Sequence, residues 1–323
     1  MPIVAANKES IARAAEALAR GEIVAFPTET VYGLGANALD ASAVAKVFAA
    51  KVRPRFNPLI VHVLGLEEAE SYAVVNGTAR KLIRAFWPGP LSLVLPRKKA
   101  CAIADLVSAG LDTIALRAPS NRIARALLEV AKLPIAAPSA NRSGRISPTI
   151  AAHVEAELGS LPAMILDGGP CALGLESTVL GVDGDDVTLL RLGALPLEEI
   201  ETVLGRKLAR PEPGSHVSSP GQLATHYAPS TPLHLDARSA KRGEALLAFG
   251  PHAPEFAGPT INLSPRGDLV EAAANFFAAL RTLDAAGVET IAVMPIPAHG
   301  LGEAINDRLK RASLPATISA ELP

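Results

Sequence analysis

The sequence predicts an α/β protein with a large, twisted, mixed sheet in a first domain and a smaller α/β unit after a linker. Three observations predict this class. The chain has 323 residues, enough for one large and one smaller domain, each with its own core. Helix-like and strand-like segments alternate only part of the time, which favours a mixed sheet over a fully parallel one. Residues 206–232 are rich in proline, glycine, serine and basic residues and separate the two parts.

The first elements follow from the spacing of apolar residues. Apolar residues from Ile11 to Leu18 recur at helical spacing between a cap at Asn7 and a stop at Gly21, and they predict a helix leading into a strand at 23–26. Val44, Val47 and Phe48 mark a second helix. Residues 59–63 alternate as a strand does, which places His62 on the same face as Ile60.

Later elements follow the same signals. Leu82, Ile83 and Phe86 predict a helix that ends at the WPGP turn of residues 87–90, and a strand follows at 91–95. Period two in residues 112–117 places Thr113, Ala115 and Arg117 on one face. Further strands are predicted at 163–166, 177–182 and 187–191. After the linker we expect a strand at 232–235, a helix at 269–283, a strand at 290–296 and a last helix at 305–312.

Composition excludes several classes of protein. No apolar run reaches the roughly 18 residues of a membrane span, and no secretory signal is visible, so we expect a cytoplasmic protein without membrane contact. Cys101 and Cys171 are the only cysteines and lack CxxC spacing, and the seven histidines show no paired ligand spacing, so no protein-held metal is expected. The net charge of −1 argues against an extended nucleic-acid-binding face but allows a small basic pocket.

Three predicted loops contain residue types that are typical of ligand-binding sites. KVRPRFN, residues 51–57, crowds three cations into a loop broken by proline, and such a cluster predicts an anion site although basic loops are more often simply solvated. FPTETVYGLGAN, residues 26–37, breaks from an apolar run into hydroxyls, a carboxylate and glycines, which predicts a strand entering a functional loop. APSANRSGRISPT, residues 137–149, resembles a phosphate cradle of hydroxyl and backbone donors.

The sequence has neither a P-loop nor a GxGxxG motif, so a nucleotide would have to be bound by scattered cations and hydroxyls instead. Arginine pairs with phosphate in a fork, lysine supplies a point charge, and hydroxyls complete the hydrogen bonds. The residues with this chemistry predict a triphosphate and nucleotide site made of Lys51, Arg53, Asn57, Ser139, Asn141, Ser147 and Arg191.

Six motifs occur in a fixed order: PTETVYGLG, KxRPxxNPL, WPGPL, LDTxxxR, SANxSGxxSPT and ESTV. Over residues 10–193 this order resembles the Sua5/YrdC/YciO superfamily of threonylcarbamoyl-adenylate synthases. SPGQLATHYAP, residues 219–229, and the following residues look like the linker and C-terminal domain of the long Sua5 type. The resemblance implies a YrdC-like open, twisted mixed sheet in 1–205, a linker or lid in 206–232, and a small Rossmann-like α/β domain in 233–323.

The resemblance also implies roles for individual residues. It assigns L-threonine binding to Thr30, His62, Arg117 and Ser177, with the Ala137 backbone nearby, and Arg117 would take the amino-acid carboxylate. It assigns Lys51 and Arg53 of the KxR motif to catalysis. The nucleotide contacts that it implies are Arg53, Asn57, Thr113, Ser139, Ser147, Arg191 and, from the linker, His226 and Tyr227.

The implied reaction joins L-threonine, bicarbonate and ATP into threonylcarbamoyl-AMP and pyrophosphate, the first step toward the t6A modification of tRNA. Mg²⁺ would arrive with ATP, held mainly by phosphate oxygens. The product would pass to the tRNA threonylcarbamoyltransferase, with at most weak contact to tRNA itself. Two alternatives remain open: a carbamoyl-adenylate former that uses carbamoyl phosphate, as in hydrogenase-maturation carbamoyltransferases, and an RNA-binding module without chemistry.

Overall fold

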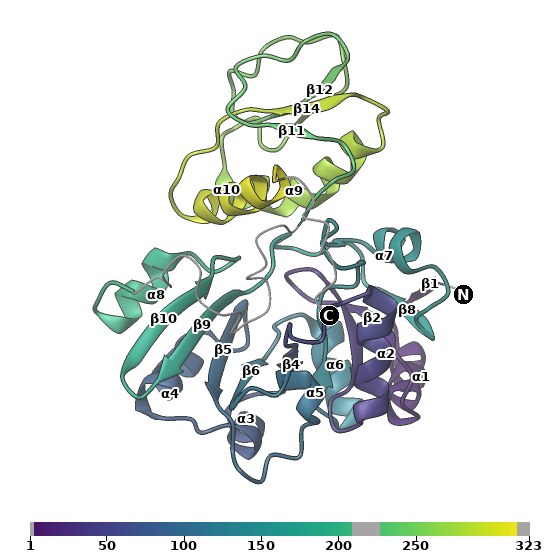
Figure 1. Ribbon diagram of the computed structural model, residues 1–323, viewed down its shortest axis with the longest axis vertical. Coiled ribbons are helices and arrows are strands. Elements are labelled where there is room, and N and C mark those ends of the chain that lie inside the picture. Colours follow the sequence, from purple (N-terminus) through teal and green to yellow (C-terminus); the bar gives the residue numbers. More distant parts are fainter. Residues whose placement is uncertain (1–2, 209–226, 315–323) are drawn as a thin grey trace, which may run out of the picture. The chain divides into compact units, whose positions relative to one another are not determined.

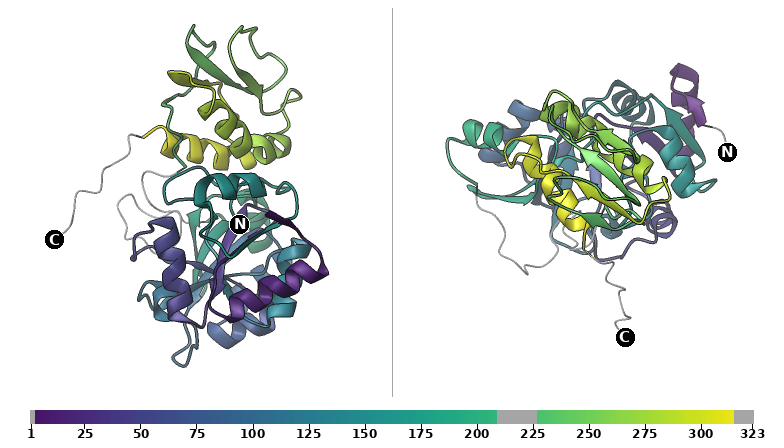
Figure 2. Two further views of the ribbon diagram at one scale, coloured as in Figure 1. Left: turned by 90° about the vertical axis from the view of Figure 1, so that its right-hand side faces the viewer. Right: turned by 90° about the horizontal axis from the view of Figure 1, so that it is seen from above.

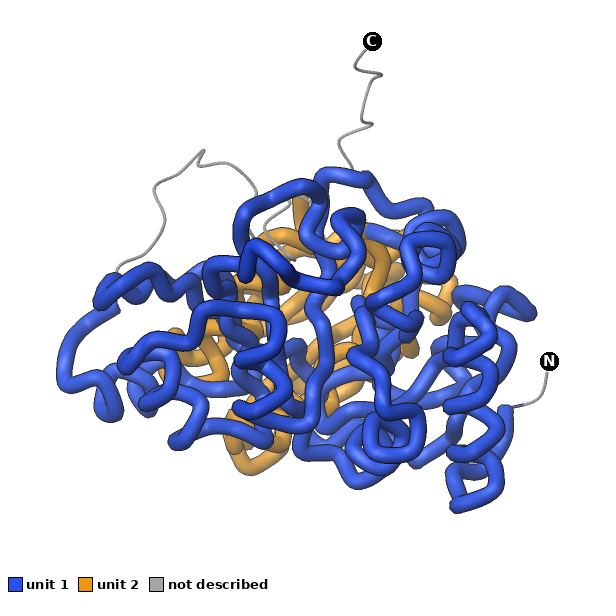
Figure 3. Tube along the Cα trace, turned by 90° about the horizontal axis from the view of Figure 1, so that it is seen from below, with its two compact units in different colours: residues 1–143, 147–222 blue, residues 144–146, 223–323 orange. Residues whose placement is uncertain are grey.

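The computed structural model describes residues 3–208 and 227–314 and divides into two compact units. Residues 1–143 and 147–222 form unit 1, while residues 144–146 and 223–323 form unit 2 (Figure 3). In the described parts of both units, no helix is long and apolar enough to cross a membrane.

Unit 1 is built on a ten-stranded sheet, most of whose strands are labelled in Figure 1. Its neighbouring strands are parallel in some pairs, such as β4 with β6, and antiparallel in others, such as β5 with β6. The predicted mixed sheet is therefore confirmed. In spatial order the strands are β1 (Ile3–Ala5), β8 (Met164–Asp167), β2 (Val24–Pro27), β3 (Tyr32–Asn37), β7 (Ile135–Ala136), β4 (Ile60–His62), β6 (Thr113–Arg117), β5 (Leu91–Pro96), β9 (Thr178–Asp183) and β10 (Asp186–Arg191).

Helices cover the two faces of this sheet unequally (Figures 1 and 2). Alternate strand residues point to opposite faces, so Ala25 and Val24 enter different apolar clusters. The larger cluster packs against α2 (Ala41–Lys51), α4 (Gly77–Phe86), α5 (Asp105–Ser108), α7 (Ala151–Leu158) and α8 (Leu197–Leu204), with α3 (Leu66–Tyr72) at its edge. On the opposite face, α1 (Lys8–Ala19) and α6 (Arg122–Ala131) cover β2, β7 and β8.

Local sequence explains where several elements begin and end. Asn7 caps α1 in a capping box with Ser10, as the predicted cap position requires. In the segment 26–37, predicted as a strand entering a loop, β2 ends at Pro27 and the loop is only residues 28–31; residues from Tyr32 onward form β3, whose glycines are strand residues. Gly35 is needed there, because a Cβ atom would lie 2.7 Å from both Ile135 and Phe26. The glycine and polar content of this segment hid the strand.

Unit 2 contains a four-stranded, fully parallel sheet in the order β11 (Leu233–His234), β14 (Thr290–Val293), β12 (Glu244–Ala248) and β13 (Thr260–Asn262). Its helices are α9 (Leu269–Asp284) and α10 (Leu301–Ala312). Within the described residues of this unit, only the connection from β13 to β14 contains a helix, α9, so unit 2 is an α/β unit with a parallel sheet. Residues 144–146 belong to this unit through the bridge of Arg145 with Ala228 and the hydrogen bond from Ala228 N to Gly144 O, 2.9 Å.

Candidate functional site

The candidate site of unit 1 lies on the part of the sheet face that α1 and α6 do not cover. Ile60, Val94, Ala115 and Val179 form a small apolar cluster there, and no helix residue among those described joins it. Because alternate strand residues share a face, His62 of β4 and Arg117 of β6 project from this same face. The uncovered face is therefore where a ligand has room to meet polar side chains.

Three predicted threonine-binding residues are placed close together. Arg117 Nη1 donates to Thr30 Oγ1 over 2.9 Å, and His62 and Arg117 are register partners in β4 and β6. Arg117 also pairs with Glu29, with 2.6 Å between Nη2 and Oε1. All of these side chains are buried. The site thus holds an arginine fork, a hydroxyl and an imidazole at neighbouring positions.

Burial sets the charge states in this cluster. Burial and the Arg117 guanidinium lower the pKa of His62 to about 3, so its imidazole is neutral at physiological pH. Its Nδ1 atom has no hydrogen-bond partner among the described residues. Burial opposes the charge of Glu29, but Arg117 and backbone hydrogen bonds outweigh it and lower the pKa of that carboxyl. The pair is therefore ionised beside a neutral histidine.

The basic loop places Lys51 in the interior. Lys51 is the last residue of α2, and its Nζ lies 2.6 Å from the Ser139 carbonyl oxygen and in hydrogen-bond contact with the Asn141 carbonyl. Burial and the nearby Arg53 guanidinium lower the pKa of Lys51 well below its ordinary range. The lysine therefore joins two predicted nucleotide-binding loops to each other.

Arg53 and Asn57 form a second contact within the basic loop. Arg53 Nη2 donates to Asn57 Oδ1 over 2.7 Å, and its Nε donates to the Asn57 carbonyl over 3.0 Å. The Nδ2 donor of Asn57 is buried and has no partner among the described residues. An amide donor held this way is ready to bind an acceptor on a ligand.

The loop of residues 137–149 lines the site alongside β3. Ala137 N donates to Ile60 O over 2.9 Å, and Ser139 forms a bridge with Gly33. Ser147 is fully buried and its hydroxyl donates to Glu176. Ser139, Asn141 and Ser147 thus lie on one loop. Its start is held by β4 and β3, and Ser147 near its end is held by Glu176.

A β-bulge directs Arg191 into the site. Leu189 pairs with Leu180, but Arg191 pairs with Val179, so Leu190 is an extra residue in β10. The shift turns Arg191 onto the face of Val179 and Ser177. Its Nη2 donates to the Ser177 carbonyl over 2.8 Å and to Ser177 Oγ over 3.1 Å.

Three further residues were predicted as nucleotide contacts. Thr113 begins β6 and is half-buried opposite Pro96, at the far end of the strand from Arg117. Tyr227 belongs to unit 2, where its buried ring stacks on Phe277 with centroids 5.7 Å apart and lies under Arg308. His226 lies outside the described residues.

The sequence analysis missed three polar residues in this region. Ser92 is buried with its Oγ 2.8 Å from Ser177 Oγ, Glu176 holds Ser147, and Thr28 holds Thr30. Glu176 stands in the ESTV motif and Thr28 in PTET, so motif membership was the available signal for both. Ser92 follows only from the period of β5, which places it on the face of Val94.

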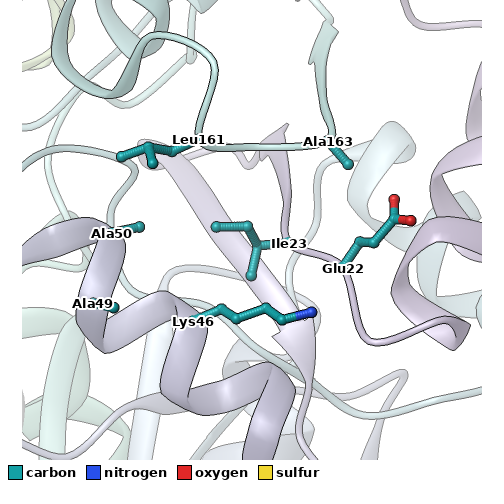
Figure 4. Close-up of a pocket in the computed structure, with 7 residues that line it drawn as sticks. All are labelled: Glu22, Ile23, Lys46, Ala49, Ala50, Leu161 and Ala163. Carbon is teal, nitrogen blue, oxygen red and sulfur yellow. The ribbon is translucent and has the colours of Figure 1, made fainter.

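A pocket of about 570 Å³ opens elsewhere in unit 1, between α2 and the segments that precede β2 and β8. Figure 4 shows Lys46, Ile23 and Leu161 around it. Lys46 Nζ donates to the Gly21 carbonyl over 2.7 Å. None of the predicted site residues lines this pocket, so the candidate site remains on the uncovered sheet face.

Comparison with known proteins identifies the family of this chain. The Sua5/YciO/YrdC family model, described as telomere recombination, matches residues 16–193, and the model of the threonylcarbamoyl-AMP synthase C-terminal domain matches residues 195–313. The chain is 42% identical to the threonylcarbamoyl-AMP synthase of Pyrococcus abyssi, over 93% of each chain. It is 40% identical to that of Bacillus subtilis, over 95% of this chain and 94% of the relative.

Comparison with solved structures points to the same family. The crystal structure of P. abyssi Sua5 complexed with L-threonine matches with a TM-score of 0.89 and 38% identity, over 97% of this chain and 98% of that one. E. coli YciO, with a TM-score of 0.55 and 24% identity, shares the fold of the first unit and covers 60% of this chain.

Proposed function

The chain belongs to the Sua5/YciO/YrdC family, and from this membership we propose that it is a threonylcarbamoyl-AMP synthase acting on L-threonine, bicarbonate and ATP. The observation that carries the proposal is the buried cluster of Thr30, His62 and Arg117 on the uncovered sheet face. An arginine fork suits a carboxylate, and a hydroxyl and a neutral imidazole suit the amine and hydroxyl of threonine. A similar structure that is 38% identical was solved with L-threonine.

The reaction needs two bond-forming steps. The threonine amine attacks the carbon of bicarbonate and water leaves, which gives a carbamate. The carbamate oxygen then attacks the α-phosphorus of ATP, and the bond to the β-phosphate oxygen breaks to release pyrophosphate. Neither step needs a covalent enzyme nucleophile.

Catalysis in this proposal rests on positioning and charge. Holding reactants in place can supply about 7 to 11 kcal/mol, and one preorganised donor about 3 to 4 kcal/mol. Arg53, Asn57 and the loop of Ser139 to Ser147 are the residues that we assign to the nucleotide. Asn57 supports this assignment, because its Nδ2 donor is buried without a partner among the described residues.

Mg²⁺ fits this site only as a companion of ATP. Among the described residues, no group of three or more histidine, cysteine or acidic side chains is arranged to hold a metal ion. The buried carboxylate of the nucleotide loops, Glu176, already accepts from Ser147. A metal bound mainly to phosphate oxygens would neutralise their charge without needing a protein cage.

The proposal extends to a cellular role. We assign the product to the t6A modification of tRNA and its delivery to the tRNA threonylcarbamoyltransferase, in the cytoplasm. The purified protein should be incubated with ATP, Mg²⁺, bicarbonate and L-threonine, with each omitted in turn, and the product followed by mass spectrometry. Threonylcarbamoyl-AMP and pyrophosphate that require all substrates support the proposal. A carbamoyl-adenylate formed from carbamoyl phosphate, or salt-sensitive tRNA binding without any product, would overturn it.

A further inference from the structure

The hydrogen bonds around Arg117 have only one possible direction. Its Nη2 reaches Glu29 Oε1 at 2.6 Å, its Nη1 reaches Thr30 Oγ1 at 2.9 Å, and its Nε reaches the Gly89 carbonyl at 3.3 Å. A guanidinium only donates hydrogen bonds. Thr30 Oγ1 must therefore accept from Arg117.

Thr28 contacts the Thr30 hydroxyl. Thr28 Oγ1 donates to the Val31 carbonyl over 2.7 Å, which uses its single proton. Its Oγ1 also accepts from the backbone N–H groups of Thr30 and Val31, both at 3.2 Å, and lies 2.8 Å from Thr30 Oγ1. Thr28 and Arg117 together therefore hold the Thr30 hydroxyl in one position.

Glu29 holds the start of this chain of hydrogen bonds. Its Oε1 accepts from Arg117, and its Oε2 accepts from the backbone N–H groups of Ser120 and Asn121, at 3.1 and 3.2 Å, where α6 begins. Both oxygens of the carboxylate thus face donors. Glu29 is 7% exposed, so solvent contributes little to its position.

We propose that Glu29 is a positioning residue of the amino-acid site: it orients Arg117, and Arg117 together with Thr28 holds the Thr30 hydroxyl. The matching ligand offers a carboxylate to Arg117 and a polar group to Thr30, as an α-amino acid with a β-hydroxyl does. The identity of that ligand rests on the proposed function, while the contacts that orient Arg117 rest on the geometry alone.

Glu29→Gln tests the proposal. Glutamine has one accepting and one donating end, so one of the two donor groups facing Glu29 meets another donor. We expect binding of L-threonine, measured by calorimetry without ATP or bicarbonate, to weaken at least tenfold, while AMP binding changes less than twofold. Unchanged threonine binding in a folded Glu29→Gln protein would overturn the proposal.

Asn121→Ala is the matched control. The Asn121 side chain caps α6 by accepting from Ile123 N at 2.9 Å and Ala124 N at 3.3 Å, whereas its backbone N–H binds Glu29. The variant weakens the helix end but keeps the Glu29 contact, so threonine affinity should stay within twofold of wild type. If Asn121→Ala lost as much threonine affinity as Glu29→Gln, Glu29 would act only by stabilising the start of α6, and the proposal would be overturned.

Thr28→Val and Thr28→Ser provide a second test that changes no charge, should Glu29→Gln fail to fold. Valine removes the hydroxyl that contacts Thr30 Oγ1 and serine keeps it, so only Thr28→Val should weaken threonine binding, by about tenfold. Equal binding by the two variants would contradict the proposal. A wild-type protein that binds threonine in calorimetry but forms no adenylate would overturn the proposed function and leave this inference standing.

Discussion

His62 and Arg117 are register partners at the ends of the parallel strands β4 and β6, and both side chains are buried. This neighbourhood places a permanent cation beside an imidazole from which water is excluded. Burial and Arg117 lower the pKa of His62 to about 3, and the negative charge of Glu29 offsets this only in part. The site therefore presents a neutral imidazole at physiological pH.

Acidification should lower the free energy of unfolding because folded His62 stays neutral. In the unfolded chain the histidine has its ordinary pKa of 6.5 and binds a proton below that pH, whereas folded His62 does not until about pH 3. The stability contribution is thus complete above pH 6.5 and is lost as pH falls, by about 1 kcal/mol per unit. His62→Gln should remove this slope between pH 6 and pH 4, measured by denaturant unfolding of unit 1.

His234 provides the control for this prediction. It is exposed in β11 of unit 2, so His234→Gln should leave the slope unchanged. A slope that survives in His62→Gln would show that other groups cause the acid sensitivity.

The buried pair of Arg117 and Glu29 should show strong coupling. Removing either partner leaves an uncompensated buried charge, which costs about 3 to 5 kcal/mol. Arg117→Ala should therefore destabilise unit 1 by about 3 kcal/mol or more, and the double variant with Glu29→Ala should be less destabilised than the sum of the two single variants. Urea unfolding of the four proteins measures this coupling. Additive losses would mean that the two charges act independently.

Lys51 should matter through the loop that it binds. Its Nζ donates to the carbonyl oxygens of Ser139 and Asn141, so Lys51→Met leaves these acceptors without their donor. We expect nucleotide affinity to fall at least tenfold and the melting temperature to drop. Lys46→Met is the control on the same helix, because Lys46 binds the Gly21 carbonyl and lies at the pocket of Figure 4, and it should retain normal nucleotide affinity. Normal nucleotide binding by Lys51→Met would exclude this role.

Periodicity and motif order predicted most of what positions the site. His62 and Arg117 were placed on strand faces from spacing alone, and the structure has them on the same face. A basic loop was predicted as an anion site, but spacing could not show that Lys51 points inward to Ser139. That contact joins residues 88 positions apart in sequence, and such pairings depend on the folded backbone.

Arg191 shows a second limit of sequence patterns. Strict alternation along β10 would place Arg191 on the same face as Leu189, toward the larger apolar cluster. The bulge at Leu190 reverses this and brings Arg191 to Ser177. Bulges have no reliable sequence signal, because any residue that tolerates the local backbone can be the extra one. Tyr227 was predicted as a nucleotide contact, a role that stays a prediction, and its ring is buried in unit 2.

Gly193→Ala should disrupt the segment that carries Ser177. A Cβ atom at Gly193 would lie 2.4 Å from the Glu176 carbonyl oxygen and from the Thr178 nitrogen, both of which are backbone atoms. A flexible side chain could move aside, but these atoms belong to the start of β9 and to the residues around Ser177. The backbone must therefore shift, which costs about 1 to 3 kcal/mol and displaces Ser177 and Glu176 together. We expect a lower melting temperature and at least tenfold weaker L-threonine binding.

Gly77→Ala is the control, because its Cβ would meet nothing within 4 Å at the start of α4, where alanine favours the helix. Wild-type threonine affinity in Gly193→Ala would show that β9 and β10 can separate without disturbing the pocket, and Ser177 would then lose its assignment to the amino-acid site.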